Sequence, residues 1–244
     1  GGRGLGRAMT LALAGAGHQV LALGHIATDE AELMTLAKSE ACADRIRYAC
    51  IDLRTPGGCD QAVAWARGAW GEVDALINNA GLAGAKGLTK DGFELAFGVN
   101  HMGHFSLTHW LLPRLKEADA SRVVTVASRA HGLAKDGVVL DRLRQPTASM
   151  TGVPEYAVSK LANVLFTRQL ARELKGSTVS CFALHPGVVD TEVWREVPRW
   201  LRPLLKLRGM LTPEQGAQTT LHCALAARVE ETGLYFDRCR VKTP

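Results

Sequence analysis

The sequence predicts one α/β domain with a doubly wound parallel sheet, and three observations support this. Short apolar runs alternate with longer segments in which apolar residues recur every three or four positions, as strands and helices alternate in βα units. The apolar runs are continuous, as expected for strands covered on both faces. No linker-like stretch divides the 244 residues, so we expect a single domain over 1–244.

The first half of the chain is expected to contain three helices and three strands. Helical spacing of apolar residues predicts the helices, and runs rich in valine, leucine and isoleucine predict the strands. In order, we expect a helix over 4–16, a strand over 18–23, a helix over 28–39, a strand over 45–53, a helix over 57–69 and a strand over 73–77.

The second half continues the same alternation. Pro154 suits the first turn of a long helix in which Val158, Leu161 and Leu165 share one face, and Gly176 ends this helix. In order, we expect a helix over 92–116, a strand over 122–127, the helix that begins at Pro154, a strand over 178–184, a helix over 213–227 and a strand over 234–236.

The chain opens on a glycine-rich turn, Gly1-Gly2-Arg3-Gly4-Leu5-Gly6, just before the first helix. A glycine turn, a helix and a strand form part of a Rossmann-like unit, whose helix N-terminus holds a pyrophosphate. Glycine clusters are also common turn punctuation, so this signal alone is weak. Such a turn normally follows a buried strand. We therefore expect that the numbering starts inside a longer protein and that the first strand, the central one of the sheet, is missing.

Tyr156 and Lys160 stand four residues apart on the helix that begins at Pro154, so their side chains share one face. A neighbouring ammonium group lowers the pKa of a phenol, which brings proton exchange with a substrate oxygen within reach. Tyrosine and lysine at this spacing also occur on ordinary solvated helices. Other residues support the catalytic interpretation, because Asp52, Asn79, Ser128 and Pro186-Gly187 end or follow strands, at the edge where ligands bind to open α/β sheets.

Composition and spacing exclude several other functions. Lysine and arginine outnumber the acidic residues by only 29 to 24, and they are spread along the chain, so we expect no nucleic-acid partner. The six cysteines and eight histidines show no metal-ligand spacing, so we expect no metal site and reduced thiols. There is no signal peptide and no apolar run long enough to cross a membrane.

Taken together, the motifs resemble the short-chain dehydrogenase/reductase family, and within it the retinol-dehydrogenase-like branch. The resemblance covers essentially the whole chain. It rests on the glycine turn, Asp52-Leu53, Asn78-Asn79-Ala80-Gly81, Val99-Asn100-His101, Val126-Ala127-Ser128, Tyr156-Ala157-Val158-Ser159-Lys160 and Pro186-Gly187-Val188-Val189-Asp190-Thr191. In this branch the chain departs from the pattern at three points. A further glycine would precede Gly1, Ala127 replaces a frequent serine, and the sequence stops soon after Phe236, so we expect truncation at both ends.

The resemblance implies a role for each matched residue. Tyr156 would be the acid/base, Lys160 would lower its pKa and hold the nicotinamide ribose, Ser128 would bind the substrate oxygen, and Asn100 would position a water. The remaining implied contacts are with a nicotinamide dinucleotide. They comprise Gly2, Arg3, Gly4, Leu5, Gly6, His25, Asp52, Leu53, Asn79, Ala80, Gly81, Pro186, Gly187, Val189 and Thr191, together with Tyr156 and Lys160 themselves.

Charge near the second strand of such a unit indicates which cofactor is bound. An acid at the end of that strand favours NAD, because it binds the ribose 2′-hydroxyl, and basic residues favour NADP. Here the strand over 18–23 is followed by Gly24 and His25, with no acid before Asp29. Arg3 is well placed for a 2′-phosphate, although a solvated arginine at a turn is the plain alternative. We expect NADP(H) as the preferred cofactor, with NAD(H) as the alternative.

The segment 191–212 interleaves apolar residues with arginine and lysine. It is interpreted as a lid over a lipophilic substrate, as a basic patch on a membrane surface, or as a plain loop with its tryptophans in the core. The resemblance implies oxidoreduction of a lipophilic alcohol and its aldehyde or ketone, retinoid- or steroid-like. The alternative is a non-catalytic member that binds nucleotide or a partner. The family resemblance also implies a homodimer through the helices that bear Asn100 and Tyr156. The implied location is on the cytoplasmic side of the endoplasmic-reticulum membrane, held by a segment absent from this chain.

Overall fold

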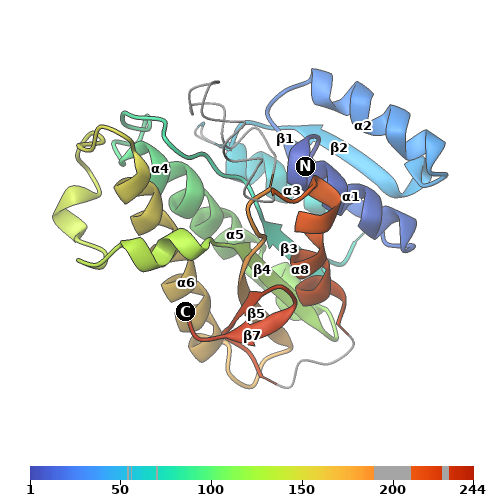
Figure 1. Ribbon diagram of the computed structural model, residues 1–244. Coiled ribbons are helices and arrows are strands. Elements are labelled where there is room, and N and C mark those ends of the chain that lie inside the picture. Colours follow the sequence, from blue (N-terminus) through green and yellow to red (C-terminus); the bar gives the residue numbers. More distant parts are fainter. Residues whose placement is uncertain (54, 56, 70, 190–209, 227–230) are drawn as a thin grey trace.

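The computed structural model describes residues 1–53, 55, 57–69, 71–189, 210–226 and 231–244. It confirms the α/β class, with strands in the middle layer and helices on both sides (Figure 1). The strands are β1 (Val20–Gly24), β2 (Ile46–Cys50), β3 (Ala75–Asn78), β4 (Ser121–Val126), β5 (Val179–His185), β6 (Leu234–Asp237) and β7 (Arg240–Lys242). The main helices are α1 (Gly4–Gly15), α2 (Thr28–Ser39), α3 (Gly58–Ala69), α4 (Leu95–Phe97), α5 (Gly103–Glu117), α6 (Val153–Glu173) and α8 (Pro213–Leu225).

Within the described residues the strands pair in two groups. β1 pairs with β2, and the other strands follow the order β3-β4-β5-β6-β7. All pairs are parallel except β6 with β7, which close a hairpin through Arg238 and Cys239, both with positive φ. The sequence did not predict β7. Among the described residues, no strand pairing joins the two groups.

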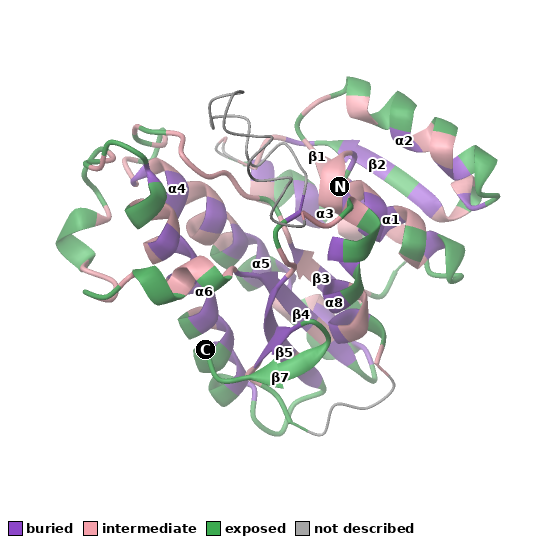
Figure 2. Ribbon diagram, viewed as in Figure 1, coloured by how far each residue is buried: buried purple, intermediate pink, exposed green. Residues whose placement is uncertain are grey.

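The core is divided between the two faces of the strands. One face packs against α3, α5 and α6, in a cluster that includes Ile51, Leu76, Val123 and Leu111. The other face of the larger group packs against α8 through Val124, Phe182 and Cys223, while α1 and α8 pack on each other. Successive residues of β4 therefore point to opposite helical layers, and Figure 2 shows this strand buried. Burial on both faces explains why the strand sequences are continuous apolar runs.

The long helix expected over 92–116 differs from the prediction at its start. It begins at Leu95, because the Glu94 side chain caps it by accepting a hydrogen bond of 2.9 Å from the Phe97 amide. The next turn, Gly98–Met102, is a π-helical turn that leads into α5. Asn100 lies in this turn and is fully buried. Such wide turns are rare and are frequent at functional sites.

Helix α8 begins with a capping box. The Thr212 hydroxyl accepts a hydrogen bond of 3.3 Å from the Gln215 amide, and the Gln215 side chain accepts one of 3.0 Å from the Thr212 amide. We expect Thr212→Ala to lower the free energy of unfolding by about 1 kcal/mol, because the Gln215 amide loses the hydroxyl that accepts its hydrogen bond. Chemical denaturation measures the change, with the exposed Gln218→Ala as the control on the same helix. An equal loss in both variants would contradict a specific contribution of the cap.

None of the described helices combines the length and the apolar character needed to cross a membrane. In the same part of the chain, no three histidine, cysteine, aspartate or glutamate side chains gather as they would around a metal ion. All six cysteines are free thiols, and Cys42, Cys181 and Cys223 are buried.

Candidate active site

The residues predicted from the ends of strands do come to one edge of the molecule. Asp52 follows β2 by two residues, Asn79 follows β3 directly, Ser128 follows β4 by two residues, and Pro186 follows β5 directly. Because these strands run parallel, their carboxyl ends share one edge. Asp52 and Leu53 lie on the β1–β2 side of this edge, with the Leu53 side chain packed against the core cluster under α3.

Helix α6 places Tyr156 and Lys160 against the carboxyl end of β4. The Lys160 side chain is buried, and its Nζ donates a hydrogen bond of 2.9 Å to the carbonyl oxygen of Val126. Nζ lies 5.7 Å from the centre of the Tyr156 ring. Burial lowers the pKa of Lys160 to about 8. The lysine is thus a buried amine that can exchange protons near neutral pH.

Tyr156 contacts the second predicted catalytic hydroxyl. A hydrogen bond with the Ser128 side chain lowers its pKa, but burial has the larger effect, so the pKa of Tyr156 is raised from its ordinary value. This direction is opposite to the one expected from Lys160. The reason is that desolvation of the phenol dominates and that the ammonium group is directed at Val126. The Ser128 hydroxyl also accepts a hydrogen bond of 3.1 Å from the Ala130 amide, which orients it.

Asn100 is held by the loop after β3 and by α6. Its Nδ2 donates hydrogen bonds to the carbonyl oxygen of Leu82 at 3.0 Å and to Ser159 Oγ at 2.9 Å. Its Oδ1 accepts from the Leu82 amide at 2.9 Å. Both amide protons are therefore engaged with protein. That Asn100 positions a water stays a prediction.

Gly81 connects this network to the lysine. A methyl group added to Gly81 would lie 3.4 Å from Asn100 Oδ1 and 3.5 Å from Lys160 Nζ. The loop Asn79-Ala80-Gly81 therefore passes directly beside two of the four predicted catalytic residues, and its neighbour Ala80 is exposed. All four residues, Asn100, Ser128, Tyr156 and Lys160, belong to one connected group of contacts at this edge.

The glycine turn lies at the same edge, beside β1. Gly2 approaches Asp29 so closely that an added Cβ would stand 2.6 Å from the Asp29 Cβ, and a Cβ on Gly6 would stand 3.3 Å from Asn79 Nδ2. The first intrahelical bond of α1 runs from the Arg7 amide to the Arg3 carbonyl at 3.1 Å. The amides of Gly4 and Gly6 precede it, and the first turn contains no acid and no side-chain cap. Close backbone approach and available amides fit a phosphate group.

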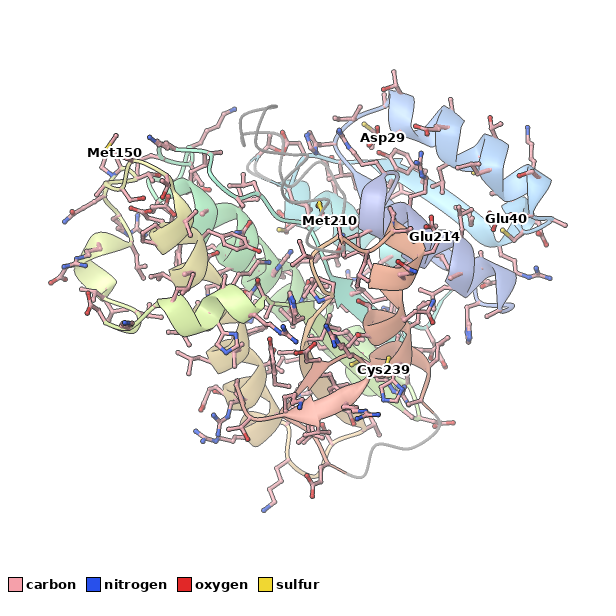
Figure 3. The ribbon with its side chains drawn as sticks, viewed as in Figure 1. Asp29, Glu40, Met150, Met210, Glu214 and Cys239 are labelled. Carbon is pink, nitrogen blue, oxygen red and sulfur yellow. The ribbon has the colours of Figure 1, made fainter. Side chains whose placement is uncertain are left out.

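Arg3 is paired with an acid that the sequence analysis did not connect to it. Its Nε lies 3.0 Å from Asp29 Oδ2, while its Nη2 is buried without a hydrogen-bond partner among the described residues. Figure 3 shows Asp29 near the N-terminal end of the chain, at the beginning of α2. In the sequence, Asp29 stands five residues beyond the end of β1, and we did not count it as an acid at the cofactor site. The turn after Gly24 brings Asp29 back beside Gly2 and Arg3. His25, in the same turn, is exposed.

The loop after β5 borders a cavity of about 240 Å³ that Pro186, Gly187, Leu211 and Gln215 help to line. Gly187 has a φ of +91°, and a Cβ there would meet the Leu211 side chain at 2.4 Å, so only glycine fits. Val189 is buried and bridges to Leu211. Thr191 and nearly all of the segment 191–212 lie outside the described residues.

The Leu5 side chain and the position of a second cavity differ from what a site made of the predicted residues alone would show. Leu5 packs against Ala8, Met9 and Ala217 between α1 and α8, so its side chain belongs to the core. A larger cavity, of about 470 Å³, lies under the loop 133–148 beside Pro154 and Val158, and none of the four predicted catalytic residues lines it within the described part of the chain.

Comparison with known proteins gives this arrangement a family. The sequence model of the short-chain dehydrogenase family matches residues 1–139 and 145–202 of this chain. The chain belongs to the short-chain dehydrogenase family. It is 47% identical over 176 residues to dehydrogenase/reductase SDR family member 13 of Bos taurus, which covers 70% of this chain and 46% of that protein. It is 46% identical over 173 residues to retinol dehydrogenase 11 of Homo sapiens, over 69% of this chain and 53% of that protein.

Solved structures share the short-chain dehydrogenase fold. Salutaridine reductase from Papaver somniferum matches with a TM-score of 0.75 at 20% identity, over 97% of each chain. L-Sorbose reductase from Gluconobacter frateurii, in complex with NADPH and L-sorbose, matches with a TM-score of 0.73 at 20% identity, over 96% of this chain and 90% of that one. The chain spans about half the length of the curated relatives it matches.

Proposed function

We propose that this protein is an NADP(H)-dependent oxidoreductase that interconverts a lipophilic alcohol and its aldehyde or ketone. The observation that carries the proposal is the contact group formed by Tyr156, Ser128 and the buried Lys160. Membership in the short-chain dehydrogenase family supports the reaction class, because relatives with 43–47% identity are named as dehydrogenases acting on retinol or as dehydrogenase/reductases.

The side chains divide the work around one substrate oxygen. The nicotinamide cofactor, when bound, supplies or accepts the hydride. During reduction, negative charge grows on the carbonyl oxygen, and the Tyr156 hydroxyl gives its proton to that oxygen. The Ser128 hydroxyl donates a second hydrogen bond to the same oxygen, which stabilises the charge. Lys160 stands behind Tyr156, and its protonated ammonium form compensates the negative charge of the phenolate that is formed. Oxidation runs these proton steps in reverse.

Residues of the glycine turn would hold the dinucleotide. The amides of Gly4 and Gly6 would face the pyrophosphate, Gly81 would leave space beside Lys160 for the ribose, and Pro186 and Gly187 would border the nicotinamide. We propose the remaining predicted residues, Gly2, Leu5, His25, Asp52, Leu53, Asn79, Ala80, Val189 and Thr191, as backbone or peripheral contacts. The preference for NADP(H) rests on the uncommitted Nη2 of Arg3, since guanidinium groups bind phosphate well.

The pair Arg3–Asp29 leads to a direct prediction about cofactor choice. If Arg3 binds the 2′-phosphate, Arg3→Ala should weaken NADPH binding by about 10- to 100-fold and change NADH binding little, because one charge-assisted contact is lost. Asp29→Asn should tighten NADPH binding, since it removes a nearby negative charge. Fluorescence titration with each cofactor measures both effects.

The control for this titration is Arg172→Ala, which removes an exposed arginine from the far end of α6. An unchanged ratio of NADPH to NADH affinity in Arg3→Ala would contradict the role of Arg3. In that case a loss of NADH affinity in Asp29→Asn would assign the ribose 2′-hydroxyl to Asp29, and with it NAD(H) as the cofactor.

The substrate class and the setting are also proposals. We propose a retinoid- or steroid-like carbonyl, of which the names of the retinol dehydrogenase relatives support the retinoid. Such a substrate suits a protein on the cytoplasmic side of the endoplasmic-reticulum membrane. A homodimer through α5 and α6 is supported by the exposed apolar side chains of Phe105 and Leu165. The Phe105 ring stacks edge-on with Phe166 at 5.6 Å between centres, which joins the two helices into one apolar face.

The test of the function is turnover. Retinal, steroid ketones and medium-chain aldehydes are offered with NADPH, and the loss of NADPH absorbance is followed. We expect turnover of at least one lipophilic carbonyl, and none of it in Tyr156→Phe. Stabilisation of the protein by NADPH against heat, without turnover of any member of the panel, would instead favour a non-catalytic, nucleotide-binding member of the family.

A further inference from the structure

Asn163 is a buried amide on α6 that no catalytic or cofactor role requires. It lies one turn beyond Ser159 and Lys160, and it is fully buried. Its Nδ2 donates a hydrogen bond of 3.0 Å to the carbonyl oxygen of Asn100. Its Oδ1 lies 3.0 Å from Nδ1 of His101. Both ends of the amide are thus attached to consecutive residues of the neighbouring π-helical turn.

The orientation of this amide is fixed by its partners. A carbonyl oxygen only accepts hydrogen bonds, so the nitrogen of Asn163 must face Asn100 and its oxygen must face His101. His101 therefore donates through a protonated Nδ1. The imidazole is mostly buried, and this burial lowers the pKa of His101. A neutral Nδ1–H imidazole satisfies the contact without burying a charge.

These contacts join the π-helical turn to helix α6 at two positions, Ser159 and Asn163. Ser159 Oγ accepts from the Asn100 side chain and donates a hydrogen bond of 2.7 Å to the carbonyl of Tyr156, while Asn163 holds the Asn100 backbone. The Asn100 side chain then reaches Leu82, in the loop that passes beside Lys160 through Gly81. If the turn relaxed to a regular α-helix, the side chain of Asn100 would rotate and this loop would lose its anchor.

We propose that Asn163 is a positioning residue, which holds the π-helical turn in the register that directs Asn100 at the active-site loop. The proposal rests on the proposed oxidoreductase function for its kinetic consequence, but not for its structural one. The titratable groups around the amide are His101, in direct contact, and His104 and Lys160, which interact electrostatically with each other.

The test compares Asn163→Leu, Asn163→Asp and the control Thr167→Val. Leucine fills similar volume but removes both contacts. We expect kcat to fall by about 10- to 100-fold, because small displacements of catalytic groups have effects of this size, with KM for the carbonyl little changed. Thr167→Val removes another buried hydrogen bond of the same helix, from Oγ1 to the Asn163 carbonyl at 2.9 Å. It should lower stability while leaving kcat unchanged.

Asn163→Asp gives the signature that a merely structural residue would lack. An ionised carboxylate would oppose the Asn100 carbonyl, whereas a protonated one can donate to it as the amide does. Burial raises the pKa of a carboxyl group. We therefore expect kcat of this variant, relative to the native protein, to rise as pH falls, while Asn163→Leu stays low at every pH. A leucine variant with native kcat and only the stability loss of Thr167→Val would overturn the proposal.

A crystal structure of Asn163→Leu separates this proposal from the proposed function. A regular α-helical turn at 98–102, with Asn100 released from Leu82, would support the positioning role even if the native protein reduced no carbonyl. An unchanged π-helical turn with the native Asn100 contacts would overturn it, whatever the turnover.

Discussion

Replacing Tyr156 by phenylalanine is expected to reduce kcat for carbonyl reduction by about 10²- to 10⁴-fold, the range that general acid–base catalysis contributes. The ring remains, so its packing beside Lys160 is preserved, and only the hydroxyl that contacts Ser128 is lost. The hydride can still be transferred, but the oxygen that receives negative charge has no positioned proton donor. Steady-state turnover with a lipophilic aldehyde and NADPH measures the effect.

Two controls accompany Tyr156→Phe. Its affinity for NADPH should stay within about threefold of the native value, since the cofactor is held mainly by backbone and by charged groups. Tyr48→Phe removes a different hydroxyl, which donates a hydrogen bond of 2.8 Å to the Ile26 carbonyl just after β1. This variant should retain turnover. Undiminished turnover in Tyr156→Phe would refute the assignment of the acid/base.

Replacing Lys160 by methionine is expected to reduce kcat about as strongly as Tyr156→Phe does. It should also change how the free energy of unfolding depends on pH. The pKa of Lys160 is lowered from 10.5 to about 8 by burial, so between these values the unfolded chain binds more protons than the folded one. Stability of the native protein should therefore rise with pH across this window. The variant lacks the group and should lose that rise, which amounts to about 3 kcal/mol over the full window.

Urea denaturation at pH 7.5 and pH 10, in the absence of cofactor, measures the gain in stability with pH in the native protein and in Lys160→Met. The matched control is Lys175→Met, which removes an exposed lysine just beyond the end of α6 and should keep the native dependence. If the native protein and Lys160→Met gained equally with pH, the pKa of Lys160 would be the same in the folded and the unfolded protein, and its role as a buried amine that exchanges protons near neutral pH would fail.

Local patterns were sufficient for the order of elements, because most helices and strands here carry their own apolar period. The positions of Tyr156 and Lys160 followed from helical geometry alone. Other features depended on contacts between distant segments. The start of the helix at Leu95 was misplaced by three residues because the capping by Glu94 competes with Gly92 as a start signal. β7 was missed because its exposed residues carry no apolar period.

The direction of the pKa shift of Tyr156 could not be read from the sequence either. Spacing shows that Lys160 lies on the same face, but only the fold shows that its ammonium bonds to Val126 while the phenol is desolvated. Similarly, the sequence shows that Arg3 stands in the glycine turn. Only the fold shows that the chain turns back after β1 and pairs Asp29 with Arg3.

The sequence by itself therefore determined the α/β class, the order of βα units and the chemical types available at the carboxyl edge, because these depend on periodicity within each segment. The tertiary structure decided which groups share protons and charges: Lys160 with Val126, Arg3 with Asp29, and Asn163 with Asn100 and His101. These pairings join residues from separate elements, and their strength depends on burial, which no local pattern encodes.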